Sequence, residues 1–417
     1  MTIPVIFACD DYYVMPLCVA VTSMIYNKKS ETVYEICVLH SGLSEQSQEK
    51  LRELESEACH IQILNVDSLT EDIQERYKEQ VISNRVSKET MYRFFVPQLF
   101  EDRKKILYLD CDMLIQSDLE QLYCIDLGKA YAGVVTDIDV EHRIKALGKN
   151  KGCYFNAGML LMNVEQIRKD AITERLLNEF LYGPQYALMD QDILNIVLDN
   201  NVVYLSEKYN FLSEVIINGG IERIAKNYCN MKCKSIVEYL DEIVILHYAD
   251  VKKPWLYELP YVTDIFMKYY KLSNFCNIYL NLMPKDMESP MDRYFVPDFD
   301  IPAGSRIILY GAGNLGKAYF QNIIVSHRYT LVGWVDSKAT NYQLQGLPVE
   351  LPSEMFNKDY DFVILGVMKE ETADDIRQML EQMGVGEEKI KWKAAWGMLS
   401  FQQVVQEYRQ ERLCQSR

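Results

Sequence analysis

Short apolar runs alternate with amphipathic segments over residues 1–275, and this pattern predicts buried strands separated by helices. The expected strands are residues 3–10, 33–42, 60–67, 105–112, 130–137 and 153–163. Helices are expected at residues 12–26 and 44–59, the second with a serine cap and helical charge spacing. Alternation of this kind is typical of an α/β fold whose largely parallel, doubly wound sheet binds ligands at the carboxyl ends of its strands.

The alternating pattern stops at residues 276–302, where four prolines and mixed charge indicate a linker. Residues 303–395 then repeat the strand and helix signals and predict a smaller Rossmann-like α/β domain. Residues 396–417 have the pattern of a C-terminal helix with a tail. We therefore expect two domains, which also agrees with the length of 417 residues.

Composition narrows the class of protein. The formal net charge of −16 argues against a nucleic-acid binder, which would show a basic face. The N-terminus lacks the pattern of a signal peptide, no run approaches the ~20 apolar residues that cross a bilayer, and the 11 cysteines are scattered as in reduced proteins. These features predict a cytoplasmic protein. The aromatic and basic stretch 266–271 offers a peripheral contact with the inner face of the membrane, although a core helix is the favoured interpretation.

Two aspartates directly after the apolar run 106–109 carry the strongest chemical signal. Asp110 and Asp112 are two positions apart, so in an extended chain their carboxylates point the same way. Converging carboxylates repel each other unless a cation lies between them, and Mg²⁺ or Mn²⁺ suits oxygen ligands. An acidic turn is the alternative, but the apolar residues on both sides favour the cation.

Further polar groups stand at the ends of other predicted elements. They are Asp10 to Tyr12 after the first strand, Arg93 in an aromatic stretch, Asn156 in a small-residue turn, and Asp190 to Asp192 at the start of an apolar helix. Each has a structural alternative: a helix cap, a buried ion pair, or an acid at a helix N-terminus. His247 ends another apolar strand shortly before Lys253. An imidazole is a common metal ligand and an ammonium binds phosphate.

Together these segments resemble the family 8 glycosyltransferases, which are retaining enzymes with an A-type glycosyltransferase fold. The resemblance runs in the family's order through residues 3–11, 92–97, 108–115, 155–163, 190–195 and 247–255. It implies a Rossmann-like mixed sheet in the first domain. It also implies transfer of a hexose, glucose or galactose, from a UDP-sugar donor to a glycan or lipid-linked glycan acceptor of the lipopolysaccharide type.

The resemblance implies roles for three groups of residues. Asp110, Asp112 and His247 would bind Mn²⁺ or Mg²⁺. The donor would be contacted by Ala8 and Asp10 (uracil), Tyr12 (ribose), Lys253 (diphosphate), Arg93, Asn156 and Asp190 (sugar), and the adjoining Asp110, Cys111 and Ala157. Gln191, with Asp190, would be the candidate catalytic group at the reacting sugar. An amide is a poor nucleophile, so we expect front-face attack by the acceptor and no covalent intermediate of the glycosidase kind.

Two positions depart from the family's pattern. Asp250 stands where the family usually has a glycine close to the phosphates, and Tyr12 stands where some members have asparagine. A carboxylate at Asp250 either repels the diphosphate or turns outward. If it repels the diphosphate, the chain would be a non-catalytic nucleotide-sugar-binding protein, which is one alternative to the transferase.

The second domain holds a dinucleotide-type fingerprint. Gly311, Gly313 and Gly316 follow a strand and open a helix, and Asp336 ends the next strand. These residues form a candidate second site for NAD or another nucleotide, and oligomer assembly is the alternative role of the domain. An oxidoreductase acting through this domain is a further alternative, which the lack of a catalytic Tyr-x-x-x-Lys disfavours.

Overall fold

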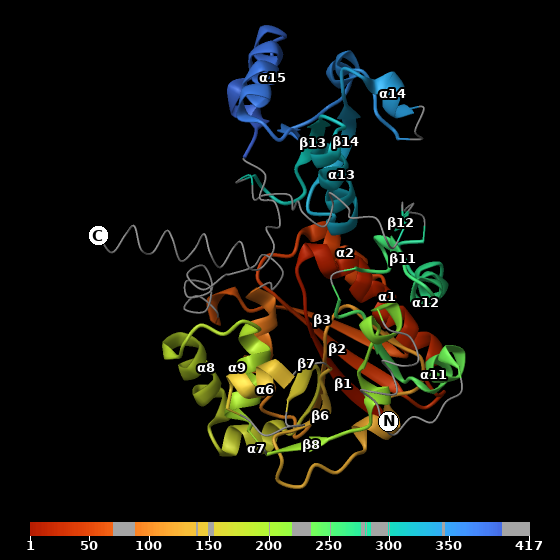
Figure 1. Cartoon of the computed structure of the whole chain (residues 1–417), viewed down its shortest axis with the longest axis vertical. Helices are drawn as coiled ribbons and strands as arrows, with labels where there is room; N and C mark the ends of the chain where they lie inside the picture. Colours follow the sequence, from red (N-terminus) through yellow and green to blue (C-terminus); the bar gives the residue numbers. More distant parts are fainter. Residues whose placement is uncertain are drawn as a thin grey trace. The chain divides into compact units, whose positions relative to one another are not determined.

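The structure is a computed structural model, and it is arranged as two compact units. It describes residues 1–69, 88–138, 141–148, 154–199, 201–218, 235–250, 252–276, 280, 282–284, 299, 301–343 and 347–393. Residues 1–42 and 50–285 form the N-terminal unit, and residues 43–49 and 286–417 form the C-terminal unit. Most of the predicted linker and all of the predicted tail lie outside the described residues. Figure 1 shows both units and labels many of their helices and strands.

A seven-stranded mixed sheet forms the centre of the N-terminal unit, in the order β3-β2-β1-β4-β7-β6-β8. The strands are β1 (Thr2–Ala8), β2 (Val33–His40), β3 (Cys59–Asn65), β4 (Ile106–Leu109), β6 (Ala132–Thr136), β7 (Phe155–Met162) and β8 (Val202–Tyr204). β7 runs antiparallel to β4 and β6, and the other neighbours in this sheet are parallel. The predicted Rossmann-like mixed sheet is therefore confirmed.

A second, three-stranded sheet was not expected from the sequence. It has the order β5-β10-β9 and comprises β5 (Met113–Ile115), β10 (Ile245–His247) and β9 (Phe211–Leu212). β10 pairs antiparallel with β5, so that His247 lies opposite Met113. Because β4 ends at Leu109 and β5 begins at Met113, the chain passes from the large sheet to the small one through Asp110 to Asp112.

Helices and short 3-10 turns connect these strands. They are η1 (Asp11–Tyr13), α1 (Val14–Asn27), α2 (Glu45–Arg52), η2 (Asp67–Leu69), η3 (Lys88–Phe95), α4 (Val96–Leu99), α5 (Glu120–Tyr123), α6 (Glu141–Ala146), α7 (Val164–Lys169), α8 (Ile172–Tyr182), α9 (Met189–Val197), η4 (Glu207–Tyr209), α11 (Ile236–Glu242) and α12 (Val262–Tyr270), with a small β11 (Tyr257–Glu258) and β12 (Met283–Pro284) pair. The first predicted helix starts later than residue 12 because the Asp10 side chain caps a 3-10 turn, accepting from Tyr13 N at 3.1 Å. α2 ends at Arg52, so the predicted helix 44–59 is too long.

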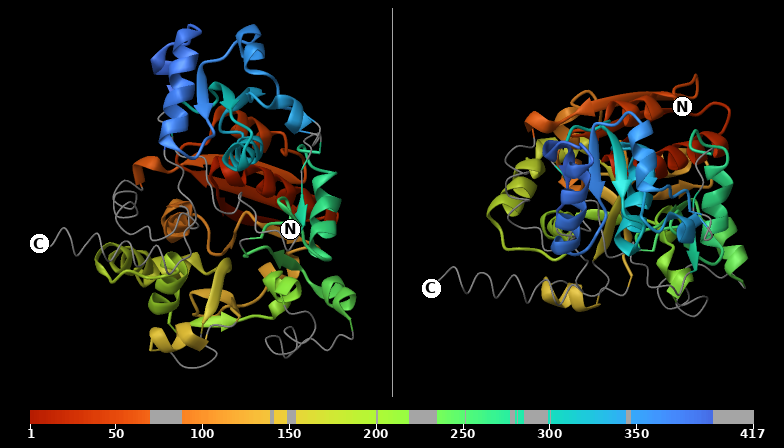
Figure 2. Two further views of the ribbon diagram at one scale, coloured as in Figure 1. Left: turned by 45° about the horizontal axis from the view of Figure 1, so that its top comes forward. Right: turned by 90° about the horizontal axis from the view of Figure 1, so that it is seen from above.

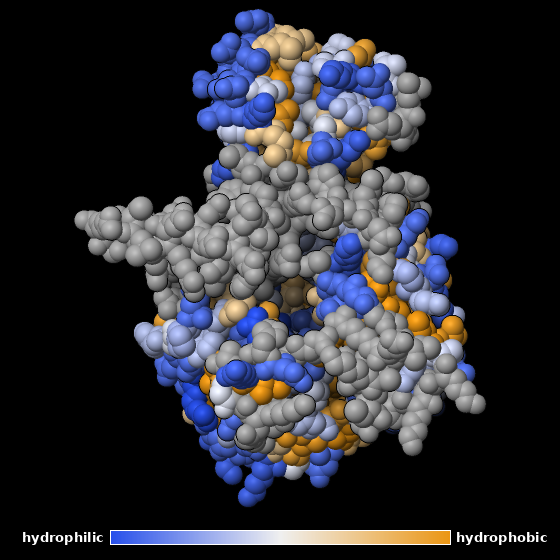
Figure 3. Space-filling model, in the orientation of Figure 1, coloured by the Kyte–Doolittle hydropathy of each residue, from blue (hydrophilic) through white to orange (hydrophobic). Residues whose placement is uncertain are grey.

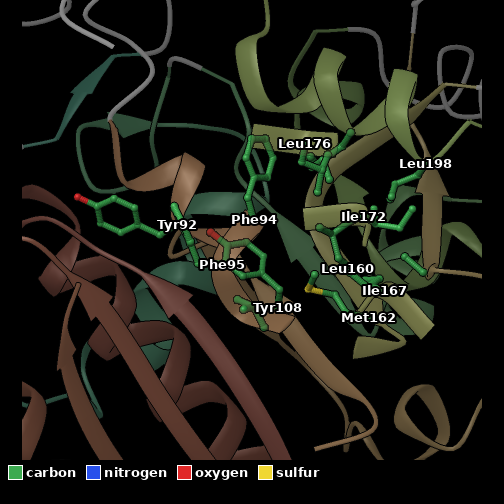
Figure 4. Packing of buried hydrophobic residues seen from close by; sticks show 14 of the residues in the cluster. Tyr92, Phe94, Phe95, Tyr108, Leu160, Met162, Ile167, Ile172, Leu176 and Leu198 are labelled. Carbon is green, nitrogen blue, oxygen red and sulfur yellow. The ribbon is translucent and has the colours of Figure 1, made fainter. Parts of the chain in front are cut away.

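One hydrophobic core lies between the large sheet and helices α7, α8 and α9, as Figure 4 shows. It combines aromatic side chains of η3 with residues of β4, β7 and the three helices, including Tyr92, Phe94, Tyr108, Leu160, Met162, Ile167, Ile172 and Leu176. Because each Å² of buried apolar surface contributes roughly 25 cal/mol of stability, the packing of these side chains holds η3 and α9 against the sheet. Both elements carry polar residues of the candidate site.

Two observations concern contact with membranes. No helix within the described residues is long and apolar enough to cross a bilayer. α12 buries Phe266, Tyr269 and Tyr270 almost completely, which agrees with the interpretation of this stretch as a core helix.

The C-terminal unit contains a four-stranded parallel sheet in the order β14-β13-β15-β16. Its elements are β13 (Arg306–Tyr310), α13 (Asn314–Ser326), β14 (Thr330–Val335), α14 (Ala339–Gln343), η6 (Pro352–Asn357), β15 (Phe362–Leu365), α15 (Glu370–Gln382), η7 (Glu387–Lys389) and β16 (Ile390–Lys391). Alternate residues of β13 face opposite sides: Ile307 and Leu309 pack with α13, and Ile308 and Tyr310 pack with α15. α15 lies along its sheet in Figure 2, and hydrophilic side chains cover its outer face in Figure 3. The smaller Rossmann-like α/β domain is confirmed.

Candidate active site

Asp110, Asp112 and His247 meet where the two sheets of the N-terminal unit join. One ligand atom from each lies within 4.8 Å of the others. His247 Nε2 is 3.3 Å from Asp112 Oδ1 and 4.0 Å from Asp110 Oδ2. Two carboxylates and one imidazole form a donor set that suits Mn²⁺, and their spacing leaves room for an ion among them. These residues therefore fit the predicted cation.

The backbone explains why these three side chains converge. Asp110 N donates to Gly158 O at 2.8 Å, and Tyr248 N donates to Asp112 O at 2.9 Å. Gly158 leaves the space into which His247 fits, because a Cβ atom there would lie 2.4 Å from His247 Cε1 and 2.9 Å from Asp110 Oδ2. Only glycine permits this close approach of the strand to the cluster.

Lys253 lies beside the cluster. Its Nζ donates to Asp112 Oδ2 at 2.7 Å and to Tyr248 O at 2.6 Å. Burial disfavours the ionised carboxylate, but Lys253 and His247 outweigh it and hold the pKa of Asp112 well below its usual range. Burial also opposes the charged ammonium, yet Asp112 raises the pKa of Lys253 above its ordinary value. A fixed positive charge is thus present in the site.

Arg93 connects the cluster to α9. Its side chain is only 2% exposed, and its guanidinium donates to Asp110 Oδ1 at 2.9 Å and lies 3.3 Å from Asp190 Oδ2. It also donates to Ala157 O and stacks 4.5 Å from the ring centre of Tyr108. Because one guanidinium pairs with both carboxylates, Arg93 fixes the distance between Asp110 and Asp190.

Asp190 is the second residue of α9 and follows a strained backbone position. The residue before it, Met189, has a φ of 35°, a left-handed conformation that costs of order 1 kcal/mol in a non-glycine residue. Burial raises the pKa of Asp190 to about 6, even though Arg93 opposes this shift. Asn195, one turn further along α9, anchors the helix to β7 with reciprocal hydrogen bonds to the backbone of Phe155 at 2.9 Å.

The amide of Gln191 is fully engaged. Its Oε1 accepts from Ala157 N at 3.0 Å, and its Nε2 donates to Asp137 Oδ2 at 2.8 Å and to Tyr154 Oη at 3.2 Å. Burial raises the pKa of Asp137. Asp137 and Tyr154 were missed by the sequence analysis. The sequence could have indicated Asp137, because this carboxylate ends a predicted strand in the same way as Asp110 does.

The carboxyl end of β1 lies next to the end of β4, as parallel pairing of these strands requires. Cys111 Sγ donates to Ala8 O at 3.1 Å. Asp10 is half-buried, and burial together with nearby Glu89 raises its pKa to about 7. Tyr12 lies in η1, half-buried. The structure therefore brings Ala8, Asp10 and Cys111 to the edge of the sheet that holds the cluster.

Asp250 takes part in an exposed contact. Its Oδ2 accepts from Asn218 Nδ2 at 3.2 Å. Its charge also contributes to the raised pKa of Lys253, although Asp112 contributes more.

The glycine-rich loop of the C-terminal unit is packed by its own residues. Gly311 has a φ of 105°, and a Cβ atom on Gly316 would lie 2.0 Å from Gly311 O. Asp336 accepts from Ala312 N and Lys338 N, each at 2.7 Å, so both of its oxygens contact backbone amides. Gly313 has open space around its Cβ position. Binding of NAD or another nucleotide at this loop stays a prediction.

Comparisons with known proteins agree with this geometry. Residues 4–258 match the profile described as "Glycosyl transferase family 8", and residues 303–391 match a different family described as "C2185-like, N-terminal". General stress protein A of Bacillus subtilis is 26% identical over 60% of this chain and 86% of its own length. Lipopolysaccharide 1,2-glucosyltransferase of Escherichia coli K12 is 24% identical over 78% of this chain and 86% of its own.

Among solved structures, the galactosyltransferase LgtC in complex with donor and acceptor sugar analogs is similar. The match has a TM-score of 0.53 and 25% identity, and it covers 65% of this chain and 96% of LgtC. It agrees with the A-type fold that the sequence predicted. Because the family profile spans more than half of the residues, the chain belongs to glycosyl transferase family 8, and the prediction that it is a glycosyltransferase enzyme is confirmed.

Proposed function

We propose that the chain is a metal-dependent, retaining hexosyltransferase that moves glucose or galactose from a UDP-sugar to a glycan acceptor of the lipopolysaccharide type. The observation that carries this proposal is the convergence of Asp110, Asp112 and His247 within 4.8 Å. Further support comes from a relative named as a lipopolysaccharide glucosyltransferase and from the galactosyltransferase LgtC.

In this proposal Asp110, Asp112 and Nε2 of His247 hold Mn²⁺ or Mg²⁺. When bound, such a cation supplies Lewis-acid stabilisation of the charge that develops on the diphosphate leaving group. Lys253 adds a second positive charge that is already positioned, since Asp112 and Tyr248 O hold its ammonium. The carboxylate of Asp250 accepts a hydrogen bond from Asn218, and its charge helps to keep Lys253 protonated.

The donor lies along the edge formed by the ends of β1, β4 and β7. Ala8, Asp10 and Cys111 contact the uracil end, and Tyr12 lies toward the ribose. Asn156, Ala157 and Asp190 contact the sugar. Arg93 contributes by holding Asp110 and Asp190 in register, through its hydrogen bond to Asp110 and its ion pair with Asp190.

The sugar is transferred by front-face attack. Gln191 is a poor nucleophile because it is an amide, and both ends of that amide are held by Ala157 N, Asp137 and Tyr154. Asp190 is paired with Arg93. The acceptor hydroxyl therefore attacks from the side that the diphosphate leaves, and a leaving phosphate oxygen takes its proton. The configuration at the sugar is retained without a covalent sugar–enzyme adduct.

The proposal also covers the cellular location of the enzyme and the role of its C-terminal unit. The transferase acts in the cytoplasm on a glycan or lipid-linked glycan at the inner face of the membrane. The C-terminal unit serves nucleotide binding or assembly into an oligomer.

A thermal-shift screen of UDP-sugars with and without Mn²⁺ tests the proposed donor and cation. UDP-glucose or UDP-galactose should raise the melting temperature only with the cation, since a ligand at 100 times its Kd adds about 2.7 kcal/mol. Asp112→Asn should abolish the shift, and Asp102→Asn, at a carboxylate that is 75% exposed, should keep it. Shifts without Mn²⁺-dependent release of UDP in the presence of acceptor would instead favour a non-catalytic nucleotide-sugar-binding protein.

A further inference from the structure

A chain of buried hydrogen bonds stands behind the cation cluster. Gly158 N donates to Asn156 Oδ1 at 3.0 Å, and Asn210 Nδ2 donates to the same oxygen at 2.9 Å. Asn210 Oδ1 in turn lies 2.9 Å from His247 Nδ1. Asn210 is 0% exposed, and Asn156 and His247 are 8% and 3% exposed, so protein atoms and not bulk water complete these contacts.

The donor and acceptor of each hydrogen bond in this series follow from its first donor, the N–H of Gly158. The two ends of an asparagine amide have the same shape, so their orientation has to come from their partners. A backbone N–H can only donate, and the N–H of Gly158 therefore requires an oxygen at the near end of Asn156. The side chain of Asn156 also hydrogen-bonds the carboxyl of Asp137, which suits its NH₂ end.

The orientation of Asn156 also determines which nitrogen of His247 carries a proton. Because Asn156 presents an oxygen, Asn210 must present its NH₂ group to it and its own oxygen to His247. The Nδ1 of His247 must then carry a proton. In a neutral imidazole this leaves the lone pair on Nε2, the nitrogen that lies 3.3 Å from Asp112 Oδ1. The opposite tautomer would set two lone pairs against each other in a buried place.

We propose that Asn210 is a positioning residue that keeps His247 in the Nδ1–H tautomer and so directs the Nε2 lone pair at the cation. This inference rests on the proposed cation site. Asn210 precedes β9, which pairs with β10, so its backbone is fixed beside the strand that ends in His247. A second partner that orients a ligating imidazole is typically worth 10–100-fold in metal affinity.

The test compares Asn210→Leu, which removes the acceptor, with Asn210→Asp, which keeps one. Free Mn²⁺ is measured by electron paramagnetic resonance without nucleotide. We expect Asn210→Leu to weaken Mn²⁺ binding by about 10–100-fold. Asn210→Asp keeps the oxygen toward Nδ1 but loses the donor to Asn156 Oδ1, so it should weaken binding less than Asn210→Leu does. Cooperative melting curves of both variants confirm that they are folded.

A second readout needs no metal. Two-bond ¹H–¹⁵N spectra of the metal-free wild type near pH 8.5, where an ordinary imidazole is neutral, report which nitrogen carries the proton. His247 is identified among the five histidines by the signal that His247→Gln removes. Nδ1 should carry the proton in the wild type and in Asn210→Asp, and should lose it, at least in part, in Asn210→Leu.

The possible outcomes separate the inference from the proposed function. An unprotonated Nδ1 in the wild type, or equal Mn²⁺ affinity of the wild type and Asn210→Leu, would overturn the inference. If the wild type binds no Mn²⁺, the proposed function fails, and the tautomer still decides whether the hydrogen-bond chain acts on His247. If Asn210→Leu does not fold, the wild-type spectrum and the behaviour of Asn210→Asp decide the matter.

Discussion

Lys253 donates a hydrogen bond from Nζ to Asp112 Oδ2 across 2.7 Å. Their side chains are only 12% and 10% exposed, so solvent weakens this ion pair far less than it weakens a surface pair. The pair keeps Asp112, a proposed cation ligand, ionised. It also keeps the ammonium of Lys253 in place beside the proposed cation site. Lys253, which follows β10, thereby sets the charge of Asp112, which directly precedes β5.

Replacement of Lys253 by methionine should lower the rate of transfer by about 10²–10³-fold, the usual loss when one pre-positioned stabiliser of transition-state charge is removed. Methionine preserves most of the side-chain length but carries no charge. The measurement is kcat with saturating Mn²⁺ and UDP-sugar. Lys104→Met is a suitable control, since Lys104 is 81% exposed and pairs with Glu165 on the surface. A Lys253→Met enzyme with wild-type kcat would contradict the proposed role.

Asp190 should give the folded protein a recognisable pH dependence. Its pKa of about 6 is above the ordinary value of 3.8, so the native state binds this proton more tightly than the unfolded state. The contribution is therefore fully present below pH 3.8 and is lost as the pH rises through about 6. A difference of about two pKa units corresponds to about 3 kcal/mol. Denaturant unfolding of the wild type from pH 4 to 7 should show this loss, and the curve for Asp190→Asn should lack it. Parallel curves would rule out the assigned shift.

Gly158→Ala should damage the cation cluster without a change of charge. The added Cβ atom would meet His247 Cε1 at 2.4 Å, so the imidazole must move away from Asp110 and Asp112. We expect Mn²⁺ affinity to fall by at least about 10-fold, since a displaced ligand loses its geometry. Gly313→Ala is the matched control, because its Cβ position has nothing within 4 Å and its φ is −69°. Mn²⁺ titration followed by electron paramagnetic resonance measures both, and equal affinities would argue against the steric account.

The C-terminal loop should depend on Asp336 even without a ligand. Asp336→Ala leaves the N–H groups of Ala312 and Lys338 without their carboxylate partner, at a cost of about 1–3 kcal/mol. Asp336→Asn keeps one acceptor and should lose less. Thermal unfolding of the full chain measures the difference. A titration with NADH in the same samples asks whether Asp336 also meets a ribose, in which case binding should weaken in both variants.

The sequence was sufficient to predict much of the candidate site. Asp110 and Asp112 were identified because two carboxylates at the end of an apolar strand are costly without a partner, and His247 was identified at the end of another apolar strand. These are local features, since a strand and its end are readable from neighbouring residues. The glycine-rich loop between β13 and α13 was predicted for the same reason.

Contacts between distant segments were not readable. Nothing near Asn210 in the sequence indicates that its amide faces His247, which is 37 residues away. The contact of Arg93 with the sugar stays a prediction, and its hydrogen bonds to Asp110, Ala157 O and Thr90 O were not readable from the sequence. Such partnerships depend on which side chains the packed core brings together, and a pattern along the chain carries no such information.

The sequence by itself therefore determined the two α/β domains, the family and most of the residues that carry charge at the site. The tertiary structure alone decided how these charges are paired. β5 and β10 form a separate small sheet, and their antiparallel pairing sets His247 opposite Met113 and beside Asp112. The physical reason is that hydrophobic periodicity specifies which faces are buried, whereas strand pairing and side-chain hydrogen bonds depend on three-dimensional proximity.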